Sequence, residues 1–487
     1  MCCAASSTSS TRPDRVDHGA AVPVRVAVVG GGITGLAAAL RLRDRLGLAA
    51  EITVYEQQHQ LGGKLRTGSL AGRTAERGAD AFLIRDPSGG EESAAVALAR
   101  RVGLGDELVH PRPLPAAVLV DGELRPIPAG TLVGVPGDLD RVAAVAQPAA
   151  ERDRDAGRPL LAAGADVSVG ELVRRRLGDQ VVDRLVDPML GGVYAGRADA
   201  LSLAATMPGL AAACRTEPTL VGAVRAALAA APRPAGTPVF AAVRGGMSRL
   251  VEAVEAAAGA TVRRGRPVRE LVPTGAGWRL VVGSTRDAEQ VAADAVVLAL
   301  PSRPAARLLR AEHPEAAALV GELDYASVAL VTLAVPGGVE PPWTGFLVPA
   351  AEGTAVKAAT FLSQKWGLPD EPRLVRASVG RYGDEQVLRL ADDALVHRVH
   401  AELGQILRHS LGQDLPLPVA AHVQRWGGAL PQYAPGHPDR VAAVRAALPD
   451  TLLLAGAGYD GVGIPACIRS GQTAADAATA ALEQSVT

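Results

Sequence analysis

The chain opens with short apolar runs on either side of one amphipathic stretch. Residues 24–29 form an apolar run that is too short for a helix and rich in β-branched side chains, so they predict a buried parallel strand. A helix is expected over residues 33–46, and a second strand over residues 52–56 ends at the acidic residue Glu56. A glycine-rich turn joins the first strand to the helix. This order of elements predicts a βαβ unit with parallel strands.

The middle of the chain has a different periodicity. Residues 94–231 carry apolar side chains mostly at three- and four-residue spacing, which predicts a block of helices. Three strands are expected further on, over residues 262–271, 278–282 and 295–300. Apolar runs between residues 323 and 381 predict a second sheet. The helical block therefore interrupts an α/β pattern, and we expect it to be an inserted domain.

The end of the chain repeats the pattern of its beginning. A predicted strand over residues 451–454 runs into a glycine-rich turn, and residues 466–481 predict a helix. Because both ends of the chain place glycine turns next to the same kind of sheet, we expect them to build one binding site together. The segments between them are then expected to bind the substrate.

The first glycine turn has the G-x-G-x-x-G spacing. Gly30 permits the tight turn, Gly32 allows a pyrophosphate to approach the backbone, and Gly35 lets the helix pack closely on the strand. The phosphates would bind the free N–H groups at the start of the helix. Glu56 can accept both hydroxyls of an adenosine ribose and would repel a 2′-phosphate. These residues predict a bound adenine dinucleotide and leave NAD and FAD open.

Length and composition narrow the class of protein. A chain of 487 residues predicts two or three domains. The net charge of −1 gives no support to nucleic-acid binding, and no apolar run reaches the length of a membrane span. We therefore expect a soluble protein, or at most a peripheral one. The four cysteines are too few and too scattered for a disulfide framework or a zinc site, so no metal is expected.

Two polar segments have simple interpretations. Residues 1–23 are rich in Ser, Ala and Thr and lack the apolar region of a secretory signal, so we expect a disordered tail. Arg174, Arg175 and Arg176 form a charge run that is typical of a solvated helix face. A membrane surface or an acidic partner is the secondary interpretation of this run.

Several motifs, taken together, resemble one known family. In chain order they are GGGITGLAAAL, the acid Glu56, LGGKLRT, ERGADAF, GVYAGRADALSL, RGGMSRL, AVVLALP, WGGALPQYAPGH and GYDGVGIPACIRSG. Over residues 24–481 the chain resembles the flavoprotein oxidases that aromatise porphyrinogens, and in particular their soluble bacterial branch. The glycine triplet, LGGK and AVVLALP are shared with the broader amine oxidase and phytoene desaturase superfamily. The GVYAG and GVGIPACI segments and the segment around Trp426 are more particular to the porphyrinogen oxidases.

The resemblance implies a fold that combines α/β and α+β parts. It implies a Rossmann-like FAD-binding domain of the p-hydroxybenzoate hydroxylase and amine oxidase type, with an inserted helical domain and a mixed-sheet substrate domain. The expected FAD-binding parts are residues 24–93, 236–305 and 426–487. The helical domain is expected over residues 94–235, and the substrate-binding sheet domain over residues 306–425.

The resemblance also implies that FAD is bound non-covalently. A second contact region at the far end of the chain suits a flavin that stays bound, which favours FAD over NAD. By family position, the first glycine turn holds the pyrophosphate, Glu56 holds the ribose, and Trp426 and the last glycine turn lie near the flavin. The implied cofactor-binding residues are Gly30, Gly31, Gly32, Ile33, Thr34, Gly35, Glu56, Gln57, Gly63, Lys64, Gly78, Ala79, Asp80, Ala81, Val268, Trp426, Val462, Gly463 and Ile464.

The implied reaction removes six electrons from a porphyrinogen to give an aromatic porphyrin in heme biosynthesis. FAD accepts the hydride and dioxygen reoxidises it with release of hydrogen peroxide. The bacterial branch implies coproporphyrinogen III as the substrate, with protoporphyrinogen IX as the alternative. Because the flavin carries the chemistry, we assign no catalytic residue. The substrate propionates call for cations, and Arg85, Lys357 and Arg197 are the candidates.

Two other functions stay open. A flavin amine oxidase would share FAD and the fold, but such enzymes commonly carry a lysine in the strand beneath flavin N5, near the place of Leu330 here. The other is a flavin-binding carrier that delivers a tetrapyrrole without oxidising it. The expected partners of the oxidase are a porphyrinogen, dioxygen and ferrochelatase. It is expected in the cytoplasm, with peripheral contact at the inner face of the cell membrane left open.

Overall fold

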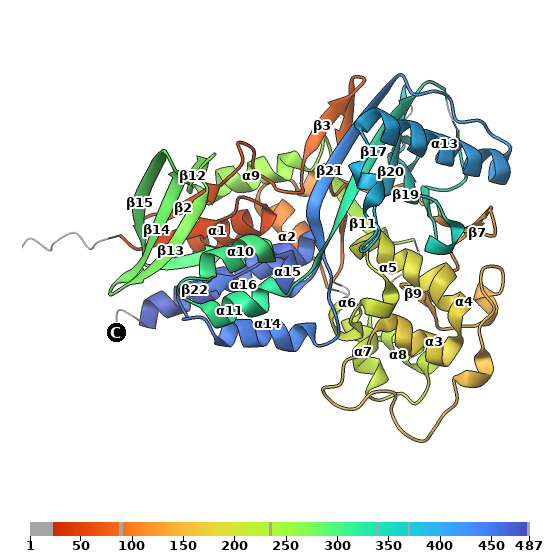
Figure 1. The fold of residues 1–487 in the computed structure, drawn as a ribbon, viewed down its shortest axis with the longest axis horizontal. Helices are drawn as coiled ribbons and strands as arrows, with labels where there is room; N and C mark the ends of the chain where they lie inside the picture. Colours follow the sequence, from red (N-terminus) through yellow and green to blue (C-terminus); the bar gives the residue numbers. More distant parts are fainter. Residues whose placement is uncertain (1–22, 87–90, 233–235, 338, 369–370, 485–487) are drawn as a thin grey trace, which may run out of the picture.

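A computed structural model describes residues 23–86, 91–232, 236–337, 339–368 and 371–484. The predicted disordered tail therefore lies outside the described residues, except for Pro23. The molecule has two lobes, and the long strands β17 (Tyr325–Val335) and β21 (Ala420–Pro431) run between them (Figure 1). One lobe contains the two ends of the chain, and the other contains most of its middle.

The first lobe is built on a five-stranded parallel sheet. Its order is β12 (Thr261–Arg264), β2 (Glu51–Glu56), β1 (Arg25–Val29), β16 (Ala295–Leu298) and β22 (Leu452–Leu454). In the central strand Val28 pairs with Val54 on one side and Val297 on the other. All three side chains are buried, because helices cover both faces of the sheet.

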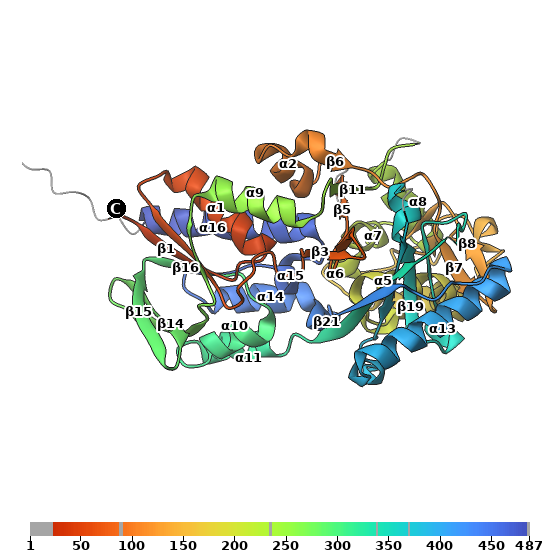
Figure 2. The ribbon, with the colours of Figure 1, turned by 90° about the horizontal axis from the view of Figure 1, so that it is seen from above.

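Two groups of helices cover the two faces of this parallel sheet (Figure 2). One face carries α1 (Ile33–Leu46), α9 (Ser248–Ala258) and α16 (Ile464–Gln484), with α2 (Ala94–Arg101) at their side. The other face carries α10 (Ser302–Leu309), α11 (Pro314–Gly321) and α14 (His437–Ala446). A three-stranded antiparallel sheet packs into the same core, with strands β13 (Val268–Thr274), β14 (Gly277–Ser284) and β15 (Asp287–Ala293).

The second lobe contains a seven-stranded mixed sheet. Its order is β21, β17, β20 (Arg373–Val379), β19 (Val356–Phe361), β18 (Gly345–Leu347), β7 (Ala117–Val120) and β8 (Glu123–Pro126). The helix α13 (Asp392–Leu411) buries one face through Leu395, Val399 and Leu403. The other face of β17 and β20 carries polar side chains such as Thr332 and Arg376 beside apolar ones, and Arg376 contacts Asp80 of the first lobe.

The block of helices lies beneath the second sheet (Figure 1). It comprises α3 (Val169–Leu177), α4 (Asp179–Val181), the π-helical turn η4 (Val182–Val186), α5 (Asp187–Tyr194), α6 (Leu203–Thr206), α7 (Pro208–Cys214) and α8 (Leu220–Ala230). These helices share one apolar core that includes Leu172, Leu185 and Leu210. Among the described residues, no helix is both long and apolar enough to cross a bilayer.

Smaller elements complete the two lobes. They are the hairpin β3 (Thr67–Leu70) and β4 (Arg73–Glu76), the small sheet of β5 (Phe82–Leu83), β11 (Phe240–Val243) and β6 (Leu108–Val109), the hairpin β9 (Thr131–Leu132) and β10 (Val135–Pro136), and the short helices α12 (Leu362–Trp366) and α15 (Ala457–Asp460).

The structure differs from the sequence pattern at two places. The strand predicted over residues 262–271 is two strands, because Gly265 turns the chain at φ +67° and sends β12 and β13 into different sheets. Within the predicted helical block, β7 and β8 form a hairpin that joins the seven-stranded sheet. Its turn residues Asp121 and Gly122 have φ of +52° and +81°, as a two-residue hairpin turn requires.

The two ends of the chain meet where α1 packs on α16. This packing is close because α16 has a glycine, Gly471, at the contact. A Cβ at Gly471 would lie 2.2 Å from the carbonyl oxygen of Thr34 in α1. The backbone of α1 cannot shift away from this Cβ without moving the glycine turn that precedes the helix.

We expect Gly471→Ala to lower the melting temperature, because the added methyl group overpacks this contact at a cost of roughly 1–3 kcal/mol. Gly404→Ala in α13 is the matched control. Its Cβ would meet only the Leu415 side chain at 3.9 Å, so the gain in helix propensity of up to about 1 kcal/mol should prevail. Thermal unfolding measures whether the melting temperature falls in Gly471→Ala and rises in Gly404→Ala. An unchanged melting temperature for Gly471→Ala would contradict the packing argument.

Candidate functional site

The glycine turn between β1 and α1 is closed by packing at two positions and open at a third. Gly30 has φ +111° and donates its N–H to the carbonyl of Tyr55 at 2.8 Å, and a Cβ there would lie 2.4 Å from the carbonyl oxygen of Ala299. A Cβ at Gly35 would lie 1.9 Å from the carbonyl oxygen of Gly30. At Gly32 a Cβ would meet nothing within 4 Å. The turn therefore offers open space to a phosphate at the N-terminus of α1.

Glu56 is buried at the end of β2, beside this turn. Its Oε2 accepts the N–H of Gly31 at 2.8 Å, and its Oε1 accepts the N–H of Gln58 at 2.7 Å. Each oxygen retains a lone pair, so the carboxylate can still accept ribose hydroxyls. The predicted neighbour Gln57 is exposed.

A second glycine loop folds against the first. Gly62 donates to the carbonyl of Gly31 at 2.8 Å and forms an isolated parallel bridge with Gly32. A Cβ at Gly63 would lie 3.5 Å from the Cα of Gly32. Lys64 follows, half-buried, and burial lowers the pKa of its ammonium. This ammonium forms no hydrogen bond or ion pair with the residues that the structure describes, so it is available to bind an anion.

The loop of residues 77–81 is anchored to both lobes. Its backbone rests on the second glycine loop, since Ala79 donates to the carbonyl of Lys64 at 3.2 Å. The carboxylate of Asp80 accepts from Lys365 at 2.8 Å and from Arg376 at 2.9 Å, both in the second lobe. Burial alone would raise the pKa of Asp80, but the two cations outweigh it and hold that pKa well below its usual range. The side chain of Asp80 thus joins the two lobes.

Trp426 makes a second connection to the same loop. It lies on β21 opposite Val328 of β17, and its indole Nε1 donates to the carbonyl of Arg77 at 2.8 Å. The guanidinium of Arg66 lies 5.5 Å from the centre of the ring. Trp426 therefore lies at the junction of the lobes, and its contact with the cofactor stays a prediction.

The last glycine turn returns the end of the chain to this junction. Gly461 and Gly463 have φ of +124° and +115°, and α16 begins directly after them at Ile464. A Cβ at Gly456, just before α15, would lie 3.8 Å from Oγ1 of Thr34 in α1. The N-termini of α1 and α16 therefore lie at the carboxyl edge of the parallel sheet, where α/β proteins bind ligands. The other predicted cofactor-binding residues are placed as follows. Val462 lies in this last glycine turn and Ile33 is the first residue of α1. Ala81 is half-buried, and Val268 is the first residue of β13.

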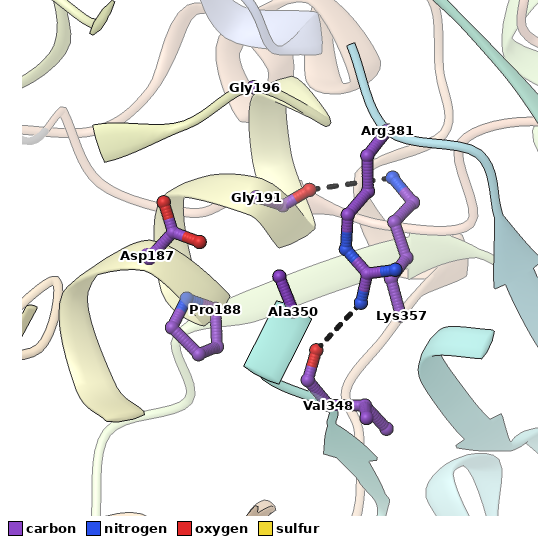
Figure 3. A pocket seen from close by; sticks show the side chains of 8 residues that line it. All are labelled: Asp187, Pro188, Gly191, Gly196, Val348, Ala350, Lys357 and Arg381. Atoms are coloured by element: carbon purple, nitrogen blue, oxygen red, sulfur yellow. Dashed lines mark hydrogen bonds between the residues drawn. The ribbon is translucent and has the colours of Figure 1, made fainter. Parts of the chain in front are cut away.

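A pocket lies between the block of helices and the second sheet (Figure 3). The buried Lys357 of β19 reaches into it, and its Nζ lies 3.4 Å from the carbonyl oxygen of Gly191. Burial, and then the neighbouring charge of Arg381, lowers the pKa of Lys357 to about 7. The other lining residues are Asp187, Pro188, Gly196, Val348 and Ala350.

The other two predicted substrate cations lie differently. Arg197 is half-exposed and pairs with Asp187 at 3.4 Å, so it lies at the pocket that Lys357 lines. Arg85 does not line this pocket. It is exposed and forms an isolated antiparallel bridge with Glu92. The structure therefore brings two of the three candidates together.

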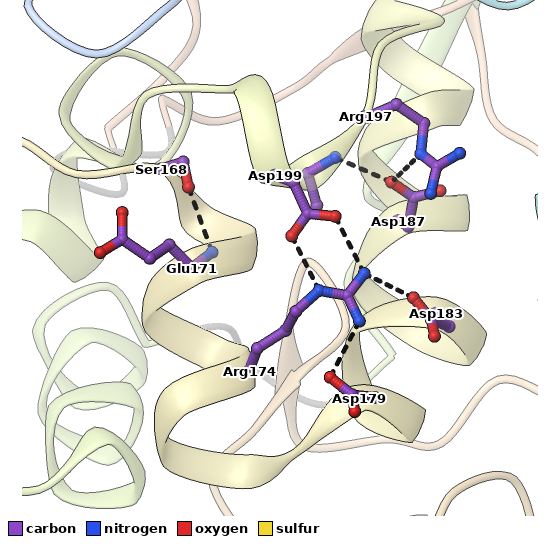
Figure 4. A network of polar contacts seen from close by, with 9 residues as sticks. Ser168, Glu171, Arg174, Asp179, Asp183, Asp187, Arg197 and Asp199 are labelled. Carbon is purple, nitrogen blue, oxygen red and sulfur yellow. Dashed lines mark hydrogen bonds and ion pairs between the residues drawn. The ribbon is translucent and has the colours of Figure 1, made fainter.

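The charge run of the sequence is not a solvated face throughout. Arg174 binds Asp179, Asp183 and Asp199 at once, at 3.2, 2.6 and 2.8 Å (Figure 4). Arg176 is mostly buried and donates to backbone carbonyl oxygens, so only Arg175 is exposed. The solvated-face interpretation is wrong for Arg174 and Arg176, because Arg174 binds three acids of the segments that follow its helix and Arg176 donates to backbone carbonyl oxygens.

Lysine is rare in this chain and is found only at the site. Of 50 lysines and arginines, the lysines are Lys64, Lys357 and Lys365 alone. They lie on the second glycine loop, in the pocket and on Asp80. Lysine is a compact point charge whose pKa responds to burial, whereas arginine stays charged. This usage is a sequence signal that would have added Lys365 to the candidates. No such signal distinguishes Arg376, Arg381 or Asp187.

Comparison with known proteins gives close relatives. A sequence model of the family described as flavin-containing amine oxidoreductases matches residues 33–479. The coproporphyrinogen III oxidase of Mycobacterium tuberculosis H37Rv is 39% identical over 95% of this chain and 99% of its own length. That of Bacillus subtilis is 33% identical over 92% of this chain and 96% of its own length. The chloroplastic protoporphyrinogen oxidase of rice is 28% identical over 96% and 90%.

Solved structures agree with these relatives. A protein of Exiguobacterium sp. 255-15, assigned as a protoporphyrinogen oxidase, superposes with a TM-score of 0.79 at 32% identity, over 95% of this chain and 99% of that one. Cyclohexylamine oxidase of Brevibacterium oxydans, with a TM-score of 0.67 at 19% identity over 95% and 100%, shares the fold. The predicted fold class is confirmed. The chain belongs to the flavin-containing amine oxidoreductase family, with FAD as its cofactor, and within that family to the porphyrinogen oxidases.

Proposed function

We propose that this protein oxidises coproporphyrinogen III to coproporphyrin III in heme biosynthesis. The reaction removes six electrons and six protons, and three molecules of dioxygen accept them as hydrogen peroxide. The observation that carries the proposal is the 39% identity, along nearly the whole of both chains, to a coproporphyrinogen III oxidase. The cationic pocket between the helices and the second sheet supports a substrate rich in carboxylates.

The chain's own residues would bind and shield the reactants. FAD supplies the electron acceptor when it is bound. We propose that the first glycine turn and Lys64 hold its pyrophosphate, that Glu56 holds its ribose, and that the turn at Val462 lies at the flavin. Asp80 and Trp426 fix the second sheet against the cofactor loop, which would keep water from the face of the reacting ring.

The substrate face of the sheet does not favour amine oxidation. Leu330 lies on the face of β17 that points away from α13, two residues from Val328, the partner of Trp426. It is a half-buried aliphatic side chain where the amine oxidases commonly have a lysine. Protoporphyrinogen IX remains the alternative substrate, and a non-oxidising flavin and tetrapyrrole carrier is the remaining rival. The proposed activity would take place in the cytoplasm or at the inner face of the cell membrane, with ferrochelatase as a partner.

We expect purified holoprotein to turn over coproporphyrinogen III with a higher kcat/KM than protoporphyrinogen IX. Porphyrin fluorescence gives both rates in air, after subtraction of autoxidation in the absence of protein. Hydrogen peroxide should form at three molecules per porphyrin, since each dioxygen accepts two electrons. A preference for protoporphyrinogen IX would reverse the assignment of the substrate. A flavin that porphyrinogen does not reduce under anaerobic conditions would favour the carrier.

Lys64→Met should weaken FAD binding by at least about tenfold, because the ammonium beside the glycine turn then no longer meets the pyrophosphate. The flavin retained after gel filtration and the Kd of the stripped protein measure this loss. Arg269→Met, at an exposed position of β13, is the control for the loss of one positive charge. Equal FAD affinity in the two variants would remove Lys64 from the cofactor site.

A further inference from the structure

The pocket of Figure 3 contains one buried and one half-buried cation, and neither has a carboxylate partner among the described residues. Lys357 is 5% exposed, and within the described residues its ammonium forms one hydrogen bond, the long one to the carbonyl oxygen of Gly191. The guanidinium of Arg381, which is mostly buried, donates to the carbonyl oxygens of Val348 at 3.0 Å and Thr354 at 3.2 Å. Neither cation forms an ion pair with any residue that the structure describes.

The one acid of the pocket is already engaged. Asp187 accepts the N–H of Ala198 at 2.8 Å and pairs with Arg197 at 3.4 Å. It lies more than an ion-pair distance from both Lys357 and Arg381. Burial raises the pKa of Asp187, which further reduces the negative charge that it can offer. Among the residues that line the pocket, the positive charges of Lys357 and Arg381 therefore outnumber the one negative charge of Asp187.

The backbone directs Lys357 into this pocket. On β19, Ala359 and Phe361 face the core under α13, so strict alternation would place Lys357 on that apolar face as well. The register against β20 shifts between Val356 and Ala358, which puts Val356 into the core and turns Lys357 to the opposite side. A β-bulge that reorients one side chain is typical of functional sites. The π-helical turn η4, directly before Asp187, is a second such irregularity.

A buried cation without a counterion costs free energy, and a ligand that brings the missing anion recovers it. Two adjacent cations on different strand ends suit the two oxygens of a carboxylate. The substrate proposed above brings such groups as its propionates. Coproporphyrinogen III has four propionates, whereas protoporphyrinogen IX has vinyl groups in place of two of them.

We propose that Lys357 and Arg381 form a carboxylate subsite that holds a propionate of coproporphyrinogen III at a position where protoporphyrinogen IX has a vinyl group. This inference rests on the proposed function. In this proposal, Lys357 and Arg381 together determine the preference for coproporphyrinogen III over protoporphyrinogen IX. It also explains the bulge, which costs β19 one ladder contact and gains the enzyme a positive charge in the pocket.

The test compares Lys357→Met and Arg381→Met with the wild type on both porphyrinogens. We expect each variant to lose at least about tenfold in kcat/KM for coproporphyrinogen III, through KM, and to change little for protoporphyrinogen IX. Arg269→Met is again the control. An unchanged KM for coproporphyrinogen III, or an equal loss on both substrates, would overturn the subsite. Failure of the wild type on both porphyrinogens would instead overturn the proposed function.

The pH dependence of kcat/KM distinguishes a role of the Lys357 ammonium in substrate binding from a role in packing. The groups that face Lys357 are Arg381 and Asp187, with Arg197, Asp384 and Glu402 around them. Because the free enzyme has Lys357 near its pKa of about 7, kcat/KM for coproporphyrinogen III should fall as the pH rises above that value. Lys357→Arg stays charged and should remove this fall. The same fall in Lys357→Arg would contradict the role of the ammonium.

Stability provides the check on folding. Since the pKa of Lys357 is about 7 in the folded protein and 10.5 when exposed, the unfolded chain binds more protons between these values. Replacement by Met should therefore raise the melting temperature most at pH 7 and below, with the gain shrinking toward pH 10. A lower melting temperature in Lys357→Met would mark the residue as structural and overturn the inference.

Discussion

The geometry of the site depends on the carboxylate of Asp80. Lys365 and Arg376 bind it from the second lobe, while its own loop rests on the glycine loops of the first. Removal of this acid would leave two cations buried without compensation, which is among the costliest changes a protein can suffer. The partners are nearly 300 positions apart in sequence, so this contact forms only when both lobes are folded. The loop of residues 77–81 and the seven-stranded sheet are thereby fixed relative to each other.

Charge is distributed unevenly around this contact. At Asp80 two cations share one acid, whereas Lys64 on one side and the pair of Lys357 and Arg381 on the other have no carboxylate of the described residues within ion-pair distance. The net charge of the chain is only −1, so the positive excess is local. It lies where we propose that two anionic ligands bind, a pyrophosphate at one end and propionates at the other. A chain that uses arginine almost everywhere else has lysines here, because a small cation with an adjustable pKa fits a closed space that must also be stable when empty.

Local patterns predict the first lobe well, because its signals are local. The helix predicted over residues 33–46 is α1, and the acid predicted to end the second strand is Glu56 of β2. Periodicity decides such elements before any tertiary contact does. The contacts of Arg174 and Asp80 are of another kind. The partners of Asp80 lie 285 and 296 positions away, and Asp199 lies 25 positions from Arg174, so only the packed structure selects them from the many acids and arginines of the chain.

Lys357 shows why the substrate end of the site is the hardest part to derive from sequence. The residue was a candidate because it is a cation in an apolar strand, yet the alternation of that strand would bury its ammonium under α13. Burial of the Lys357 ammonium in an apolar core is unfavourable, so either this segment is not a strand or its alternation is interrupted. The register shifts, and the shift is set by pairing with β20, which begins more than ten residues later. A charged residue at a position that strict alternation assigns to the apolar face of a strand therefore indicates a bulge, and a binding site beside it.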